Sequence, residues 1–265
     1  MKHRQKYLSV RLLAMAGLLT MAPIQGAWAL TEPGLGKASN FAVLGSSAVT
    51  CDSIGAVPPD VSSVAGDVGS LTAVTGFPPT YHLCTIAGHV HVNDGAANDA
   101  IRDFHLAYNE LRDRSDLACP RSDATHNIDV DLAGKTLSPG VYCLGSASPA
   151  LLSGHLILDG NGDKNAVWIF KAGSSITPIG GLVTMAGGGQ ACNVYWQAPK
   201  EVSLDNTDFL GNILSATAVT FTGVGSSLVG RAFGDTGVTM TGGADIAISD
   251  SGNGRTQPKS CNPHK

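Results

Sequence analysis

The sequence predicts a mostly β, single-domain fold: a β-solenoid with one long α-helix packed along a side. Two columns of similar segments advance along the chain with nearly the same step. Each segment alternates apolar and polar residues, as a half-buried strand does. A third observation predicts the helix, because apolar residues in the segment 93–114 recur at three- and four-residue steps.

The first column is a set of five-residue segments that read apolar, small polar, apolar, variable and then a turn residue. They start at Val183, Val202, Val219 and Val238, so that successive starts differ by 19, 17 and 19 in the numbering. An earlier segment starts at Leu156, and its wider separation from Val183 indicates one longer coil. Stacked coils of this kind bury a continuous core that no single coil could bury alone.

The second column keeps the same step. Its members are Asn165, Asn193, Asn212 and Arg231, which differ by 28, 19 and 19 in the numbering. The strands around it are apolar on both faces, as in the segment 167–170. A strand buried on both faces needs another element packed outside it.

The segment 94–114 supplies that element as one long helix. Its apolar stripe consists of Ala97, Ile101, Phe104, Tyr108 and Leu111. Asn93 or Asp94 stands at the N-cap position, where a side-chain oxygen can accept a backbone N–H. We therefore expect this helix to lie against the doubly apolar face.

The two ends of the chain are set apart from the solenoid. Residues 1–29 combine a basic start, a short apolar stretch and the AWA motif of a cleavage site, so we expect a secretory signal peptide cut after Ala29. The solenoid domain then spans 30–250 and a polar tail spans 251–265. We expect a secreted protein, or a periplasmic one if it is not released, with no membrane attachment after cleavage.

The segment 35–90 reads as further short strands without a clean period. It forms either the remaining coils or a cap over the open end. The letters TAVT occur in it at 72–75 and again at 217–220. Since the first copy runs directly into GFPP, we interpret it as a turn outside the regular coils.

Six cysteines in an exported chain favour disulfides, with fifteen possible pairings. Neighbours in the sequence suggest three tentative pairs: Cys51 with Cys84, Cys119 with Cys143, and Cys192 with Cys261. The chain contains no Cys-x-x-Cys motif, so a zinc site of that type has little support.

Composition and motifs argue against several function classes. Charged residues are 14% of the chain and the net charge is −4, which gives no basis for a nucleic-acid partner. The loop 159–165 lacks the glycine and the glutamate that an EF-hand requires. His89 and His91 share a strand face but have no evident third ligand. We therefore expect no metal and no cofactor.

An enzymatic function has weak support. Asp205 and Asp208 could form a carboxylate pair for glycosidic chemistry, but no basic residue to hold an acidic sugar is nearby. The glycines 187–189 lack the Lys-Ser/Thr of a phosphate loop. A polysaccharide-active enzyme is thus the least favoured alternative, and we expect no catalytic residues.

An ordered set of motifs over residues 35–247 resembles a known family. In chain order, the motifs are LGKASNFAVLGSSAVT, AVTGFPP, AYNELRDR, LSPGVYC, LDGNGDKNAVWIFKAGSSIT, ACNVYWQ, GNILSATAVTFTG and GRAF. They resemble the secreted ice-binding (antifreeze) proteins of cold-adapted bacteria, diatoms and fungi. The resemblance implies a three-sided, right-handed, discontinuous β-solenoid with a helix along one side, and a flat uncharged face that binds the surface of an ice crystal.

Threonine suits an ice-binding face, because its hydroxyl anchors water, its methyl group cages water and its branched Cβ fixes the rotamer. We predict an inner file of outward residues at Thr184, Ser203, Thr220 and Thr239. The outer file beside it is Ala186, Asp205, Thr222 and Thr241. Thr217 lies at the edge of this surface, and Asp205 is a strongly hydrated charge within it.

Threonine is also common in exposed strands for reasons unrelated to ice. The alternative function is therefore a non-enzymatic extracellular adhesion or structural module that uses the same face. In either case we expect a monomer.

Overall fold

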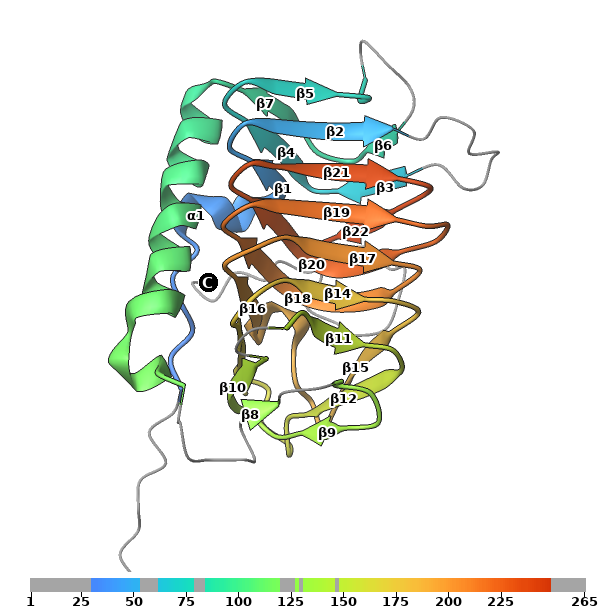
Figure 1. The fold of residues 1–265 in the computed structure, drawn as a ribbon. Coiled ribbons are helices and arrows are strands. Elements are labelled where there is room, and N and C mark those ends of the chain that lie inside the picture. Colours follow the sequence, from blue (N-terminus) through green and yellow to red (C-terminus); the bar gives the residue numbers. More distant parts are fainter. Residues whose placement is uncertain are drawn as a thin grey trace, which may run out of the picture.

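The computed structural model describes residues 30–52, 62–78, 84–119, 127–128, 131–145 and 148–248. They form a three-sided solenoid of stacked parallel strands with one long helix along a side (Figure 1). The predicted signal peptide and the tail 251–265 lie outside the described residues.

The solenoid has a threonine face, from which threonine side chains project, a helix face, which the long helix covers, and a third face. The threonine face is a separate sheet with the strands, in spatial order, β11 (Ala150–Leu152), β14 (Ile176–Pro178), β17 (Val202–Asp205), β19 (Ala218–Thr222), β21 (Gly237–Thr241), β2 (Ala48–Asp52) and β5 (Ala73–Thr75). The helix face comprises β8 (Asn127–Ile128), β10 (Gly140–Leu144), β13 (Trp168–Ala172), β16 (Val194–Ala198), the second halves of β18 (Asp208–Ser215) and β20 (Ser227–Gly234), β1 (Phe41–Gly45), β4 (Asp67–Ser70) and β7 (Val90–Val92).

The third face is built from the remaining strands of the larger sheet. They are β9 (Thr136–Leu137), β12 (His155–Asp159), β15 (Leu182–Ala186), the first halves of β18 and β20, β22 (Asp245–Ala247), β3 (Ser62–Ala65) and β6 (Cys84–Ile86). The described residues also include three short 3-10 helices: η1 (Gly36–Asn40), η2 (Ser115–Leu117) and η3 (Ala191–Asn193).

The chain does not climb the stack in sequence order. The N-terminal strands β1, β2 and β3 pair with β20, β21 and β22, which are the last strands of the described chain. The long helix then runs down the side of the stack to the opposite end, where the coils restart at β8 (Figure 1). Of the two possibilities for the segment 35–90, its described residues therefore form the remaining coils.

The predicted coil length is confirmed in part. Val202, Val219 and Val238 are neighbours at successive rungs of the threonine face, as the repeat predicts. Val183 pairs with Leu156 as expected, but both belong to the third face, so the extension of the first column to Val183 is wrong. The preceding neighbour of Val202 on the threonine face is Ile176, which lies further back in the chain than one regular step.

The second column shows a similar shift. Asn212 pairs with Arg231 as predicted, but its other neighbour is Tyr195 and not Asn193. The reason is the corner between the third face and the helix face. Strands β18 and β20 pass this corner unbroken, with Gly211 and Gly230 at positive φ, whereas the coils before them add loops at 160–167 and 187–193. A Cβ at Gly230 would collide with the carbonyl oxygen of Gly211, so glycine is needed at this corner.

Helix α1 (Gly95–Asp113) and its packing confirm the prediction. Asp94 is the N-cap, and its side chain accepts a hydrogen bond from the backbone N–H of Ala97 at 2.8 Å. All five residues of the predicted stripe are buried. The four after Ala97 pack against outward side chains of the helix face, including Leu44, Ile169 and Phe233. The helix thus covers a face that would otherwise be apolar and exposed.

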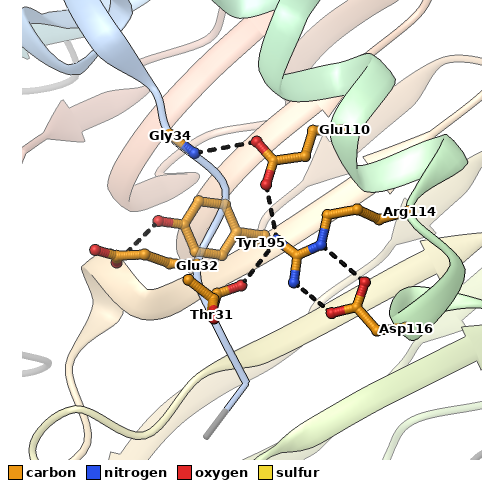
Figure 2. A network of polar contacts seen from close by, with 7 residues as sticks. All are labelled: Thr31, Glu32, Gly34, Glu110, Arg114, Asp116 and Tyr195. Atoms are coloured by element: carbon orange, nitrogen blue, oxygen red, sulfur yellow. Dashed lines mark hydrogen bonds and ion pairs between the residues drawn. The ribbon is translucent and has the colours of Figure 1, made fainter.

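The chain before β1 is held between α1 and the solenoid (Figure 2). Arg114 donates to the carbonyl oxygen of Thr31 at 3.2 Å and to the Glu110 carboxylate at 2.7 Å. It also forms two hydrogen bonds with Asp116. Tyr195 donates to Glu32 at 3.3 Å, and burial raises the pKa of the Tyr195 phenol so that it remains a neutral donor. These contacts tie the segment before β1 to the C-terminal end of α1 and to β16.

Two of the three tentative disulfides are present. Cys51–Cys84 joins β2 on the threonine face to β6 on the third face, with a Cα–Cα distance of 6.3 Å. Cys119–Cys143 joins the segment after α1 to β10, with a Cα–Cα distance of 5.7 Å. Cys261 lies outside the described residues, so its pairing with Cys192 stays a prediction.

Candidate functional site

The threonine face is a side of the solenoid that helix α1 does not cover (Figure 1). Along its strands β19 and β21, apolar residues point inward while small or hydroxyl residues point out. In β19, Val219 and Phe221 are completely buried, whereas Thr220 and Thr222 are partly exposed. The same alternation in successive coils aligns the outward residues into files, because the strands are parallel and in register.

Three files of outward residues result. The inner file, in spatial order, is Leu151, Thr177, Ser203, Thr220, Thr239, Thr50 and Thr75. The outer file is Ile179, Asp205, Thr222, Thr241 and Asp52. A third file, named here the alanine file, is Ala218, Gly237, Ala48 and Ala73.

The files form a regular lattice of hydroxyl and methyl groups. Neighbouring rungs lie about 4.8 Å apart, and alternate residues along a strand lie about 6.6 Å apart. Both distances follow from the backbone pairing, so the lattice is as rigid as the sheet beneath it. The small residues of the alanine file keep one margin of the lattice flat, since no side chain there extends beyond a Cβ.

Several hydroxyls are oriented by hydrogen bonds to the preceding coil. Thr241 donates to the carbonyl oxygen of Phe221 at 2.9 Å, and Thr222 donates to that of Leu204 at 3.4 Å. Thr220 donates to the Glu201 carboxylate at 2.8 Å. In the outer file, these bonds fix the χ1 angles of Thr222 and Thr241, whose side chains are partly exposed.

Thr184 and Ala186 do not belong to this surface, so their placement in the predicted files is wrong. Both lie in β15 on the third face, where Thr184 pairs with Ile157 and its hydroxyl lies 2.7 Å from the ring nitrogen of His155. The longer coils explain the error. A constant step from Val202 back to Val183 crosses a corner of the prism instead of descending one rung.

The other predicted residues lie on the threonine face. Ser203, Thr220 and Thr239 are consecutive rungs of the inner file, and Thr222 and Thr241 are consecutive in the outer file. Thr217 lies at the corner directly before β19. The structure thus brings together six of the seven predicted side chains in one region.

Sequence reasoning missed Thr50, Thr75 and Thr177, which continue the inner file in both directions. A signal for two of them was present. The first TAVT copy, at 72–75, is no turn outside the coils: its last three residues form β5, in the same rung positions as residues 218–220. The two copies are equivalent, and the AVT of residues 48–50 lies in the same columns.

Carboxylates interrupt the lattice at identifiable places. In the outer file, Asp205 lies directly before the pair Thr222 and Thr241, and Asp52 lies directly after it. Glu201 directly precedes β17 and is level with Ala218 of the next coil. The rungs from β19 to β5 are otherwise uncharged.

The candidate catalytic and metal-binding groups make local structural contacts instead. Asp205 and Asp208 belong to strands of different faces, and Asp208 accepts a hydrogen bond from Ser227 at 2.5 Å, so the proposed carboxylate pair does not form. His91 lies 2.7 Å from the Asp94 carboxylate. In the loop 159–165, Asp159 accepts a hydrogen bond from the backbone N–H of Asn161 at 2.9 Å, as in an Asx-turn.

Within the described part of the chain, no group of three or more His, Cys, Asp or Glu side chains is arranged to hold a metal ion. The described helices include none that is long and apolar enough to cross a membrane.

Comparison with known proteins points to one family. A family model described as ice-binding-like matches residues 43–244. An ice-binding protein of Nostoc sp. (strain HG1) is 38% identical over 208 residues, which cover 78% of this chain and 71% of that protein. A crystal structure of an ice-binding protein from an Antarctic biological consortium has a TM-score of 0.68 and 31% identity, covering 86% of this chain and 96% of that one. One from the Antarctic ascomycete Antarctomyces psychrotrophicus has a TM-score of 0.70 and 25% identity, with coverages of 83% and 100%.

Proposed function

Because the chain belongs to the ice-binding-like family, we propose that it adsorbs to ice crystals through the threonine face and so inhibits their growth or recrystallisation. The protein carries this out as an exported monomer, without a cofactor and without catalysis. The residues that contact ice are those of the inner and outer files around Thr220, Thr222, Thr239 and Thr241, together with Thr50 and Thr75.

The observation that carries this proposal is the unbroken run of threonines at successive rungs of the inner file. Thr220, Thr239, Thr50 and Thr75 come from two segments far apart in the sequence, yet they align at one rung spacing. A rigid lattice of this kind holds adjacent water in fixed positions, since its methyl groups exclude bulk water while its hydroxyls anchor the ordered layer. Water ordered in this way can join the surface layer of an ice crystal.

The test is thermal hysteresis and inhibition of ice recrystallisation with the purified mature chain. Thr239→Tyr places a ring across the middle of the lattice and is expected to remove most of the thermal hysteresis. Thr220→Tyr is expected to behave in the same way. Thr184→Tyr is the matched control, because it adds the same ring to the third face.

Three results would contradict the proposal. An inactive wild-type chain would favour the adhesion or structural alternative. Full activity in both Thr220→Tyr and Thr239→Tyr would exclude this face as the contact surface. A loss in Thr184→Tyr equal to that in Thr239→Tyr, with unchanged thermal unfolding, would transfer the contact to the third face.

A further inference from the structure

The seven rungs of the threonine face are not equivalent, and the difference lies at β17. On one side of β17, the rungs of β19, β21, β2 and β5 present threonines flanked by the alanine file, and the one charged residue in these four strands is Asp52, at the end of β2 in the outer file. On the other side, β14 and β11 present Thr177 beside large apolar residues: Ile179 is 61% exposed and Leu151 is 41% exposed. The first group is called here the upper zone and the second the lower zone.

Strand β17 places two carboxylates between these zones. Asp205 is the β17 residue of the outer file, level with Thr222. Glu201 takes the position in the alanine file that Ala218 takes one rung further. Its carboxylate reaches across to the upper zone and accepts a hydrogen bond from Thr220 at 2.8 Å. At β17, both flanking files therefore carry a negative charge, one on either side of Ser203. At β2, in contrast, Asp52 stands in the outer file alone, because the alanine file carries Ala48 there.

A carboxylate opposes the ordering of water that the threonines support. It holds its own hydration shell strongly, and removing or rearranging that shell is costly. Its waters point their hydrogens toward the charge, which is not the arrangement that a hydroxyl and methyl lattice imposes. The bond from Thr220 to Glu201 also withdraws one threonine hydroxyl from the anchoring of water.

We propose that Glu201 and Asp205 end the ice-contact surface at β17, so that the upper zone alone contacts ice and the lower zone does not. This inference rests on the proposed function. It assigns half of the contact rungs to the N-terminal strands β2 and β5. It also identifies Thr177 as a lattice-compatible residue that is kept out of contact by its charged neighbours.

The experiment compares Glu201→Ala/Asp205→Thr with the wild type. These substitutions copy Ala218 and Thr222 of the next rung, so they extend the lattice through β17 to Thr177. The number of contact rungs rises from four to six, and we expect thermal hysteresis at equal molar concentration to rise by about half, if activity scales with the area in contact. Asp208→Thr/Asp245→Thr is the matched control, because it removes two carboxylates from the third face. It should leave the activity unchanged.

A second substitution tests the extension directly. Thr177→Tyr should have no effect in the wild type, where β14 is out of contact, but should cancel the gain in the Glu201→Ala/Asp205→Thr background. Circular dichroism and thermal unfolding establish that each variant is folded.

The outcomes separate the two proposals. If the wild type has no activity, the proposed function fails and this inference fails with it. If the wild type is active but Thr177→Tyr alone lowers its activity as much as Thr239→Tyr does, the contact surface does not end at β17. An unchanged or lower activity of folded Glu201→Ala/Asp205→Thr would also overturn the inference.

Discussion

The two disulfides provide a matched pair of perturbations. Replacing both cysteines of a pair by alanine removes a covalent loop, and the loops differ little in length, with sequence separations of 33 and 24 residues. The chain-entropy relation gives about 3.7 kcal/mol for Cys51–Cys84 and about 3.4 kcal/mol for Cys119–Cys143. The two double variants should therefore lose nearly the same free energy of unfolding.

Their positions differ far more than their loop lengths. Cys51 is the inward residue between Thr50 and Asp52 in β2, and β5 has β2 as its one partner among the described strands. Strands β5, β6 and β7, at this end of the stack, have only three residues each. Cys119–Cys143 instead lies on the helix side. Loss of Cys51–Cys84 should therefore loosen the rungs of Thr50 and Thr75, whereas loss of Cys119–Cys143 should not.

The assay combines thermal hysteresis near 0 °C with hydrogen exchange followed by mass spectrometry. For Cys51→Ala/Cys84→Ala, we expect faster exchange in 48–52 and 73–75, and activity reduced to that of Thr50→Tyr/Thr75→Tyr. For Cys119→Ala/Cys143→Ala, we expect the activity and the exchange in these segments to match the wild type. Equal losses of activity in the two double variants, or full activity in Cys51→Ala/Cys84→Ala, would refute this reasoning.

Two further predictions concern the buried Arg231 of β20 and the N-cap of α1. Arg231→Met should lower the free energy of unfolding, measured by guanidinium denaturation, by about 2–4 kcal/mol, because it leaves buried acceptors such as the Asn212 side chain unpaired. The control is Arg102→Met, on the exposed side of α1, which should change this free energy by less than about 1 kcal/mol. Equal effects of the two substitutions would contradict the structural role of Arg231. Asp94→Ala should lower the free energy of unfolding by about 1 kcal/mol at pH 7 through loss of the N-cap. The hydrogen bond from the Ala97 N–H lowers the pKa of Asp94 below 3.8. The carboxylate's contribution to the free energy of unfolding is therefore complete above that pH, and it is lost as the pH falls through the lower folded-state pKa. Thermal unfolding at pH 7 to pH 2 should show that the difference in unfolding midpoint between the wild type and Asp94→Ala narrows only below about pH 3.8. A difference that stays constant over this range would show that the charge of Asp94 does not contribute to stability.

Much of the fold could be predicted from the sequence because the patterns that indicate it are local. The stripe from Ala97 to Leu111 predicts α1 and its buried side, since helical periodicity is set within a few turns. The step from Val219 to Val238 predicts the coil, because Gly211 and Gly230 turn the corner within single strands and keep these coils at constant length. Two of the disulfide pairs followed from proximity along the chain.

The sequence predicted only some of the residues that form the threonine face. The sequence determined that hydroxyl residues alternate with buried valines, and so that a threonine lattice exists on some side of a solenoid. It did not determine which coils share that side: the longer coils change the phase of the repeat, which put Thr184 on the wrong face. The pairing of β2 with β21 joins strands from opposite ends of the described chain, and no local pattern encodes such a contact. Only the tertiary structure placed Thr50 beside Thr239 and Thr75 one rung beyond Thr50. The reason is that the alignment of the files depends on the register between strands that meet only after the helix has carried the chain from one end of the stack to the other.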